Sequence, residues 1–533
     1  MTTDYISFKK TGYFSELICD YLEESDALKT FYYNFPKLEN FKNQIESKQS
    51  SFSSNTRSVL VKALQKQYKD VNISQPTLLN INALSNNNTF TVTTGHQLNL
   101  FTGPLYFLYK IASTINLAKT LKQEYSNYNF VPVYWMATED HDFDEINYFN
   151  FKGKKVQWPR QASGAVGELS NEGLESVFEV FSKVLGLGNN AETLRQLFES
   201  AYLKNNNLAD ATRYLANTLF ADYGLVILDA NDKHLKELFI PFMKEELVDQ
   251  TAYKFVTETS KELNSLTTNY KVQVNPREIN LFYLAEGLRE RIVFEDNTYK
   301  VINTKLSWSS SEIKKELLAH PERFSPNVIM RPLYQEVILP NLCYIGGGGE
   351  LAYWLQLKSY FEKMKVTFPM LLLRNSVLVK TEKQAEKQEK LGLSNADLFL
   401  KQEALIQKKT KQLSAIEIDF STQKIHLKEQ FKELHKLAKQ TDKSFLGAVS
   451  AQERKQIKGL EHLEKRLMKA QKRKLSTQLN KVKMLQNELF PNQSLQERNT
   501  NFSELYLEFG DELIPTLIKK LKPLKRDFTV LTI

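Results

Sequence analysis

A long stretch without proline is the feature that most constrains the fold of this chain. No proline occurs from Met370 to Phe490, although the whole sequence contains 15. Because proline interrupts helices, this absence permits long continuous helices. Apolar residues in this stretch recur every seven positions, at Phe399, Ile406, Leu413, Phe420, Leu427 and Leu434. The spacing predicts one long amphipathic helix.

A second long helix is predicted from about Glu453 to Phe490, after the break TDKSFLGAVSAQ. Its apolar stripe consists of Leu460, Leu463, Leu467, Leu475, Leu479, Val482 and Leu489. Together the two helices predict an antiparallel coiled-coil arm over residues 376–490. A two-helix hairpin leaves part of its apolar stripe unburied, so we expect a homodimer that forms through this arm.

The positive charge of the chain is concentrated in the arm. The formal net charge is +9, but residues 375–490 carry 25 Lys+Arg and 14 Asp+Glu, a net of +11. The remainder is therefore nearly neutral, at −2. Basic surfaces attract nucleic acid, yet no aromatic residues alternate with these lysines. The solvated faces of helices explain them more simply, so nucleic acid is not the expected partner.

The first 375 residues alternate between strand-like and helix-like runs, which predicts an α/β core with a parallel sheet. Strands are expected at TFTVTT (89–94), FVPVYWMA (130–137) and GLVILD (224–229), and later around Tyr344 and at Met370–Leu373. Insertions into the sheet order are expected near 151–200 and 250–325. The second insertion contains a strand pair, REINLFYL and RIVFED, and residues 491–533 return to the core.

Cysteine usage and hydropathy limit the cellular setting. Cys19 and Cys343 are the only cysteines, which excludes a disulfide framework and a cysteine zinc cluster. Cys343 lies in the apolar run LCYI, where a buried inert thiol is expected. Neither a spanning segment nor a signal peptide is visible, so no membrane association is expected and the protein is predicted to be cytoplasmic.

Three polar clusters follow predicted strands, where ligands bind in open α/β sheets. His96 and Gln97 follow the first strand in TGHQ, and a helix follows their loop. The second cluster, TEDHD, follows the buried strand VYWMA, and Asp144 and Glu145 come directly behind it. Five crowded carboxylates at one strand end need a cation, a substrate amine or hydrogen-bond donors to offset their repulsion. His96 and the four residues Glu139, Asp140, His141 and Asp142 are thus the predicted catalytic groups; any metal remains unspecified.

The third cluster is a strand that runs into a glycine turn. Tyr344 is followed by Gly346, Gly347, Gly348 and Gly349, a turn that lets the backbone approach a phosphate or carboxylate. Arg331 and Gln335, one strand upstream, are predicted with Gln97 and Tyr344 to bind substrate. A second polar pocket is predicted where the arm begins and returns, formed by Arg374, Asn375, Ser376 and Arg498; with the four glycines these residues are the predicted nucleotide site.

At these motifs the chain resembles a known family. The blocks TTGHQLNLFTGPLYFLYKIASTINLAKTL, FVPVYWMATEDHDFDEIN and MRPLYQEVILPNLCYIGGGGELAYWLQL are similar, in order and spacing, to those of the bacillithiol synthases of the BshC type. The coiled-coil tail and its LQER return are similar too. The resemblance implies a Rossmann-like core related to class I synthetases and nucleotidyltransferases, and a coiled coil that mediates homodimerisation.

The resemblance also implies an activity, the addition of cysteine to glucosaminyl-malate through an amide bond. Amide formation requires an activated carboxyl group, so ATP or ADP is expected as ligand or co-substrate, with magnesium as a candidate ion; neither zinc nor flavin is indicated. Two other functions remain open. One is a nucleotidyl- or aminoacyl-transferase that holds RNA on the basic arm, and the other is a noncatalytic coiled-coil scaffold that binds nucleotide.

Overall fold

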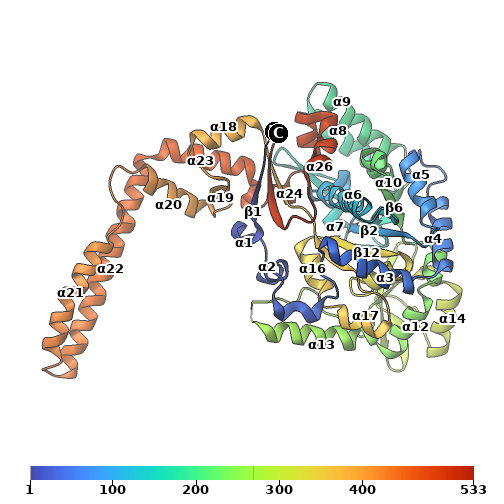
Figure 1. Cartoon of the computed structure of the whole chain (residues 1–533), viewed down its shortest axis with the longest axis horizontal. Helices are drawn as coiled ribbons and strands as arrows, with labels where there is room; N and C mark the ends of the chain where they lie inside the picture. Colours follow the sequence, from blue (N-terminus) through green and yellow to red (C-terminus); the bar gives the residue numbers. More distant parts are fainter. Residues whose placement is uncertain (1, 268) are drawn as a thin grey trace. The chain divides into compact units, whose positions relative to one another are not determined.

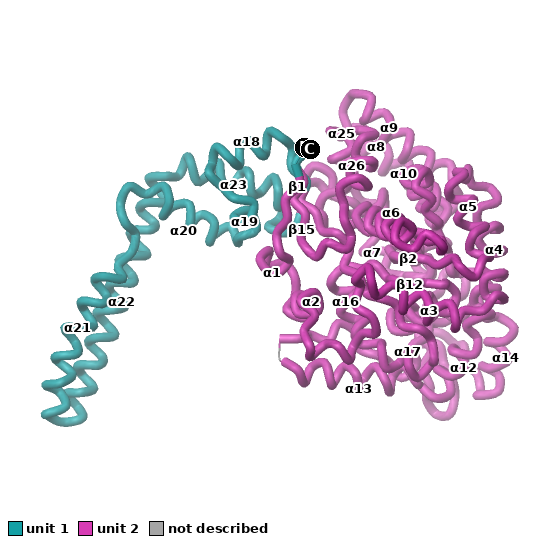
Figure 2. Tube along the Cα trace, viewed as in Figure 1, with its two compact units in different colours: residues 1–2, 379–495, 532–533 teal, residues 3–378, 496–531 magenta. Residues whose placement is uncertain are grey.

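The computed structural model describes residues 2–267 and 269–533, which form two compact units (Figure 2). The core unit comprises Thr3–Leu378 and Gln496–Leu531. The arm unit comprises Val379–Leu495 together with the chain ends. The return segment predicted for 491–533 is thus divided, because residues up to Leu495 group with the arm unit.

A parallel sheet of five strands lies at the centre of the core unit (Figure 1). Its order is β13-β12-β2-β3-β6. The strands are β2 (Thr89–His96), β3 (Asn129–Met136), β6 (Val226–Asp229), β12 (Asn341–Gly346) and β13 (Met370–Leu373). These positions confirm the predicted α/β class. From β2 the chain adds β3 and β6 on one side, then β12 and β13 on the other. This reversal makes a topological switch point between β2 and β12.

Burial on both faces explains why these strands consist largely of apolar and β-branched residues. Every residue of β2 is buried, and helix α6 (Tyr106–Glu124) packs against β2 and β3. Apolar side chains of the strands meet those of α6 and of α3 (Phe41–Ser51) in one cluster, which includes Val92, Leu117 and Cys343. Burial raises the pKa of the Cys343 thiol well above its ordinary value. The predicted burial of this thiol is thus confirmed.

The two expected insertions contain smaller sheets. The first includes the end of a hairpin of β4 (Tyr148–Phe151) and β5 (Lys154–Gln157), followed by helices α8 (Leu174–Leu185) and α9 (Asn189–Phe198). The second contains most of an antiparallel sheet of order β10-β9-β8-β7-β11. Its members are β7 (Leu281–Ala285), β8 (Leu288–Glu295), β9 (Thr298–Val301), β10 (Ser307–Trp308) and β11 (Phe324–Pro326). The predicted strand pair is confirmed as β7 and β8, which are joined by a tighter turn than expected.

The arm unit is built of antiparallel helices, but the prediction of one unbroken first helix was wrong. Helix α20 (Gln402–Leu413) ends before α21 (Ser421–Ala438) begins. In the gap, the Asp419 carboxylate accepts hydrogen bonds from the backbone N–H and the hydroxyl of Ser421. Such local side-chain bonds compete with helical hydrogen bonds. The heptad spacing alone therefore did not keep α20 and α21 in one continuous helix.

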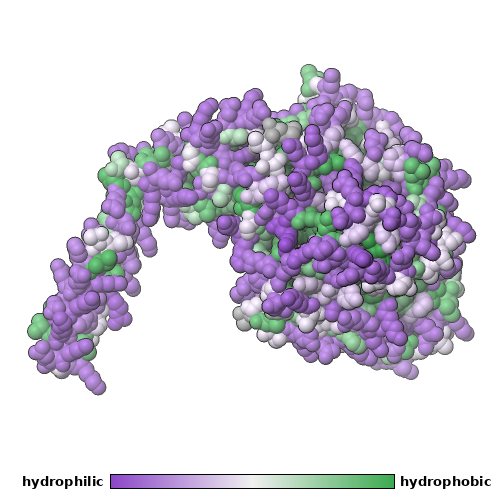
Figure 3. Space-filling model, viewed as in Figure 1, coloured by the Kyte–Doolittle hydropathy of each residue, from purple (hydrophilic) through white to green (hydrophobic). Residues whose placement is uncertain are grey.

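The second arm helix also differs from its prediction. Helix α22 (Lys443–Lys474) begins ten residues earlier than expected, because Asp442 caps it by accepting from the Phe445 N–H. It ends at Lys474, and α23 (Ser476–Leu489) follows after Leu475. Helices α21 and α22 pack together as a hairpin, and α20 packs against α23. Hydrophilic residues cover most of the visible surface of α21 and α22 (Figure 3).

Over residues 2–267 and 269–533, no helix is both long and apolar enough to cross a bilayer.

Candidate active site

A cavity of about 1060 Å³ opens in the core unit at the carboxyl ends of the parallel strands. It is lined by His96 at the end of β2, Met136 at the end of β3, Tyr344 near the end of β12 and Arg374 after β13. The cavity therefore lies at the switch point between β2 and β12, where open α/β sheets bind ligands. His96 is the last residue of the strand, and not a loop residue as the sequence had suggested.

One side of the cavity carries the acidic cluster that follows β3. Asp140 accepts hydrogen bonds from Gln97 Nε2 at 3.0 Å and from the His141 N–H at 2.8 Å. Burial opposes ionisation, but the hydrogen bonds from Gln97 and the His141 backbone and the charge of Arg289 lower the pKa of Asp140. Glu139 forms an ion pair with Lys236, whose side chain is fully buried. Asp140 is therefore an ionised carboxylate in a fixed position.

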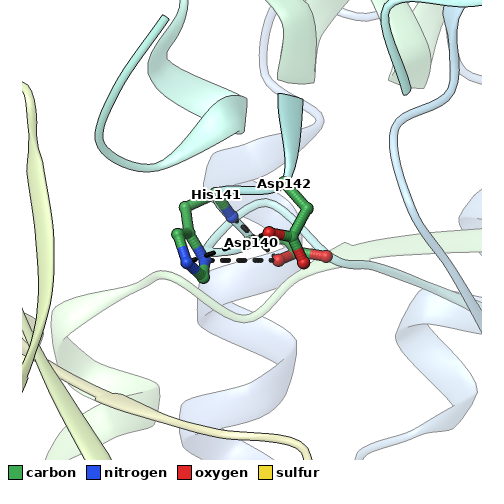
Figure 4. A group of neighbouring side chains, drawn as sticks. All are labelled: Asp140, His141 and Asp142. Carbon is green, nitrogen blue, oxygen red and sulfur yellow. Dashed lines mark hydrogen bonds and ion pairs between the residues drawn. The ribbon is translucent and has the colours of Figure 1, made fainter. Parts of the chain in front are cut away.

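The neighbouring residues His141 and Asp142 complete this cluster (Figure 4). Ligand atoms of Asp140, His141 and Asp142 lie within 4.8 Å of one another, close enough to share a metal ion. However, Arg289 Nη1 lies 2.6 Å from His141 Nδ1 and 4.0 Å from Asp140 Oδ1. A guanidinium therefore already faces the cluster from the side on which these two ligand atoms lie. Burial and the charge of Asp140 raise the pKa of Asp142.

A second charged group in the cavity is organised around a buried lysine. Lys110, on α6, donates to the Gly95 carbonyl at 2.7 Å and pairs with Glu350 at 2.6 Å. Glu350 also accepts from the Tyr344 hydroxyl at 2.7 Å and from the Gly347 N–H at 2.8 Å. Burial opposes ionisation of Glu350, but Lys110 lowers its pKa, so the carboxylate stays charged. These contacts fix Tyr344 and the glycine turn against the sheet.

His96 lies next to this charged group as a neutral imidazole. Burial, together with the charges of Lys110 and Arg374, holds the pKa of His96 well below its ordinary value. The ring has a hydrogen bond to the backbone of Thr102, while Nε2 has no partner among the described residues. Nδ1 must therefore make that bond, and Nε2 presents a free lone pair. His96 can accept a hydrogen bond from a ligand.

The structure separates the roles predicted for Arg331 and Gln335. Both lie on helix α15 (Arg331–Ile338), whereas the sequence reading had not predicted a helix there. Arg331 lines the cavity, and its Nη2 donates to the Tyr353 hydroxyl at 3.2 Å. Gln335 is fully buried outside the cavity lining, and its Oε1 accepts from Arg331 Nη1 at 3.1 Å. The prediction that Gln335 contacts substrate was wrong, because one helical turn places it behind Arg331.

The glycine turn is also divided in its roles. Gly347, Gly348 and Gly349 line the cavity, but Gly346 does not. A Cβ at Gly346 would lie 2.9 Å from Leu351 Cδ1 and 3.0 Å from Glu350 Cβ, so close packing requires this glycine. Its assignment as a ligand contact is therefore corrected.

The predicted pocket at the root of the arm is mostly structural. Arg374 Nη2 donates to Glu497 at 2.8 Å, and Nη1 donates to the Asn375 carbonyl and the Ser376 hydroxyl. Asn375 and Ser376 are buried and do not line the cavity, which corrects their assignment. Arg498 does line it, as does Arg374, whose buried Nε finds no hydrogen-bond partner within the described part of the chain. Arg374 thus retains one donor for a ligand.

Sequence reasoning missed four charged residues that organise the site: Lys110, Lys236, Arg289 and Glu497. Lys110 had a detectable signal, since it is the single charge in the otherwise apolar run LYFLYKIA. Glu497 lay unnoticed inside the return motif LQERN. Lys236 and Arg289 gave no signal, because they reach the site from segments about 100 and 150 residues further along the chain.

The sheet order and the polar cavity at its switch point define a Rossmann-like α/β protein with a small-molecule site. Family models agree with this class and extend it. Residues 1–375 match the N-terminal Rossmann-like domain of bacillithiol biosynthesis BshC, and residues 377–533 match its C-terminal coiled-coil domain. The chain belongs to the BshC family, which confirms the resemblance expected from the motifs.

Relatives cover the chain from end to end. A Flavobacterium johnsoniae protein is 62% identical over 533 residues and covers all of both chains. A Cytophaga hutchinsonii protein is 37% identical over 98% of this chain and 97% of its own, and a Bacillus anthracis protein is 30% identical over 87% and 88%. Each bears the name "Putative cysteine ligase BshC".

A solved structure was also compared with this chain. A Campylobacter jejuni protein, described as a "putative arginyl t-RNA synthetase", is 12% identical over 84% of this chain and 98% of its own, with a TM-score of 0.21. Such a slight likeness carries no argument about fold or function.

Proposed function

We propose that this protein ligates L-cysteine to glucosaminyl-malate, forming an amide bond in bacillithiol biosynthesis. The carrying observation is that one cavity holds an acidic cluster and a group of basic side chains. Glu139, Asp140 and Asp142 belong to the first, which Arg289 also contacts, and Lys110, Arg331, Arg374 and Arg498 belong to the second, in which Glu350 pairs with Lys110. The names of the full-length relatives support a cysteine ligase.

The proposed substrate matches the charges of these two groups. Glucosaminyl-malate carries an amine on its sugar and two carboxylates on its malate. Arginine recognises carboxylates through paired hydrogen bonds, and carboxylates hold ammonium groups. We therefore orient the malate toward Arg331 and the other basic side chains, and the amine toward the residues after β3. Binding in this orientation would align the reacting nitrogen with the carboxyl carbon that it attacks.

In the proposed reaction the sugar nitrogen attacks the activated carboxyl carbon of cysteine. A C–N bond forms, the bond to the activating group breaks, and the nitrogen gives up a proton. A carboxylate of the cluster Glu139–Asp142 is the proposed proton acceptor, since the cluster lies where the amine would bind. His96, with its free Nε2 lone pair, is proposed to accept a hydrogen bond from a ligand group near the basic side chains.

Activation of the cysteine carboxyl requires a co-substrate, and we propose ATP with magnesium. The residues present fit a phosphate group, because Gly347–Gly349 line the cavity beside the buried, unpartnered Nε of Arg374. These residues and Arg498 would hold the nucleotide. When bound, it would supply the leaving group that makes the carboxyl carbon electrophilic.

Assembly and location form part of the same proposal. Apolar side chains are exposed on the arm helices, including Ile425 (55%), Leu437 (57%) and Leu463 (53%). A second copy of the arm would bury them, so we propose a cytoplasmic homodimer formed through α21 and α22. Sedimentation of the L437E/L463E variant tests this: a monomer supports the proposal, and an unchanged species contradicts it.

The activity is tested by mass spectrometry of pure protein incubated with glucosaminyl-malate and cysteine, with ATP and magnesium present or withheld. Formation of bacillithiol supports the ligase, and its dependence on ATP supports the proposed activation. Product without ATP would refute that activation, and no product under either condition would count against the ligase.

The acidic cluster is tested by alanine at Asp140 and at His141. Each variant should lose turnover by at least about 10²-fold, the usual contribution of acid–base groups, while remaining folded. Alanine at Glu145, whose carboxylate also accepts from Gln97 at 3.0 Å, is the matched control for loss of a nearby negative charge. Full turnover in the Asp140 variant would refute the assignment.

A further inference from the structure

Arg289 is the residue that joins the inserted sheet to the acidic cluster. It lies on β8, and its side chain is only 8% exposed although it lines the cavity. Nη1 lies 2.6 Å from His141 Nδ1, and Nε lies 3.4 Å from the Ser325 hydroxyl on β11. The guanidinium stacks on the Phe282 ring of β7 at 4.0 Å. Three strands of one sheet thus fix this arginine in place.

The chemistry of arginine determines the state of His141. A guanidinium only donates hydrogen bonds and stays protonated in proteins, so His141 Nδ1 must be the acceptor. In a neutral imidazole the proton then lies on Nε2. His141 Nε2 lies 3.9 Å from Asp142 Oδ1, so the N–H is on the side of the ring near that carboxylate. The His141 ring also packs against Phe282, with 5.5 Å between ring centres, which restricts its rotation.

We propose that Arg289 is a positioning residue that holds His141 as the neutral Nε2–H tautomer, so that His141 donates a hydrogen bond in the cavity and does not accept the proton of the substrate amine. The inference rests on the proposed ligase function and deepens it. It excludes the imidazole as proton acceptor, because one ring nitrogen is occupied by Arg289 and the other already carries a proton. Proton removal is left to a carboxylate of the same cluster.

The same geometry gives Arg289 the electrostatic role that a metal ion could otherwise have. Its charge lies 4.0 Å from Asp140 Oδ1, and it contacts the imidazole nitrogen that faces that carboxylate. A divalent cation held by Asp140 and His141 Nδ1 would be a like charge beside a buried arginine. We therefore expect the cluster of Asp140, His141 and Asp142 to work without a resident metal.

The tautomer is measured directly by two-bond ¹H–¹⁵N correlation on the full-length protein labelled in its histidine rings. The chain has 7 histidines, and the H141Q variant identifies the signal of His141. The unaltered protein should show a protonated Nε2 and an unprotonated Nδ1. In R289M this pattern should be lost, and R289K, which retains a charged donor, should restore it at least in part. R291M removes another arginine of β8 that lines the cavity and should leave the His141 signal unchanged.

A proton on Nδ1 in the unaltered protein, or an unchanged His141 pattern in both R289M and R289K, would overturn the proposal. Tight Mn²⁺ binding that D142N abolishes would also overturn it. None of these readouts needs turnover, so they remain decisive if the protein proves not to be the proposed ligase. If it does ligate, R289M should lower kcat by about 10²-fold with a smaller change in KM, the pattern of a lost transition-state interaction. An equally large rise in KM with kcat unchanged would indicate a substrate-binding arginine and would contradict the positioning role.

Discussion

A buried ion pair behind the cavity provides the sharpest test of how the core unit supports its site. Lys48 of α3 and Glu336 of α15 lie 3.1 Å apart, and their side chains are 2% and 0% exposed. Glu336 Oε1 also accepts from Gln335 Nε2 at 2.9 Å, and Gln335 in turn accepts from Arg331 in the cavity. We predict that K48M leaves a buried carboxylate without its cation and destabilises the core unit.

The magnitude follows from the burial of the pair. Removing one partner of a fully buried ion pair costs about 3–5 kcal/mol of unfolding free energy, because the remaining charge cannot be hydrated. With an m value of ~3 kcal/mol/M in urea, the unfolding midpoint of K48M should fall by about 1–1.7 M. The amide donors of Gln335 and Asn341 compensate part of the charge, which favours the lower end of this range.

The stability that is lost in K48M should depend on pH in a defined direction. Burial raises the pKa of Glu336, although Lys48 opposes the shift, so removing Lys48 raises this pKa further. A carboxyl group whose folded pKa exceeds its unfolded value binds more protons in the folded state, so stability falls as pH rises through that interval. The penalty of K48M should thus be full above the raised folded pKa, and should shrink toward the unfolded value of about 4.3.

Tryptophan fluorescence can measure this unfolding for the core unit alone, because all 4 tryptophans lie in it: Trp135, Trp158, Trp308 and Trp354. The K9M variant is the matched control, since Lys9 pairs with Glu23 while 61% of its side chain is exposed, and its midpoint should not change measurably. The reasoning is refuted if K48M behaves like K9M, or if its penalty stays the same from about pH 8 to about pH 5.

Three further predictions follow from the site. G346A should destabilise the core unit by about 1–3 kcal/mol in urea unfolding, because its Cβ would press on Leu351, whereas G349A should change it by less than about 0.5 kcal/mol. E497A leaves the buried Arg374 guanidinium without its partner, so the free energy of unfolding should fall by about 3–5 kcal/mol in the same assay. An unchanged midpoint would contradict the ion pair. The pKa of Asp140 is about 2 in the folded protein and near 3.8 in the unfolded chain. Asp140 therefore stabilises the folded protein above about pH 3.8, and this contribution is lost as the pH falls toward about 2. In an acid titration the D140N variant should lose less stability than the unaltered protein.

Local pattern predicted most of the architecture, for a physical reason. A strand buried on both faces must be continuously apolar or β-branched, so TFTVTT, FVPVYWMA and MLLL indicated β2, β3 and β13 from sequence alone. The helices of the arm were less predictable. Heptad spacing gives the apolar face of a helix but not its ends, which depended on the hydrogen bonds of Asp419 and Asp442.

For the candidate site, sequence alone identified the residues that follow strands of the parallel sheet. His96, Asp140, Tyr344 and Gly347 all line the cavity, because the carboxyl ends of parallel strands meet at one edge of the sheet. The sequence could not show that Gln335 lies outside the cavity lining, one turn beyond Arg331 on the same face of α15, where it accepts a hydrogen bond from Arg331.

Only the tertiary structure determined which polar groups are paired. Lys110 with Glu350, Lys236 with Glu139, and Arg289 with His141 join segments that are 97 to 240 residues apart. An ion pair depends on separation in space, and no periodicity in the chain encodes it. The sequence therefore determined the sheet, the class of the fold and the residues near the cavity, whereas the folded chain determined the charge of each group and hence which groups can exchange a proton with a substrate.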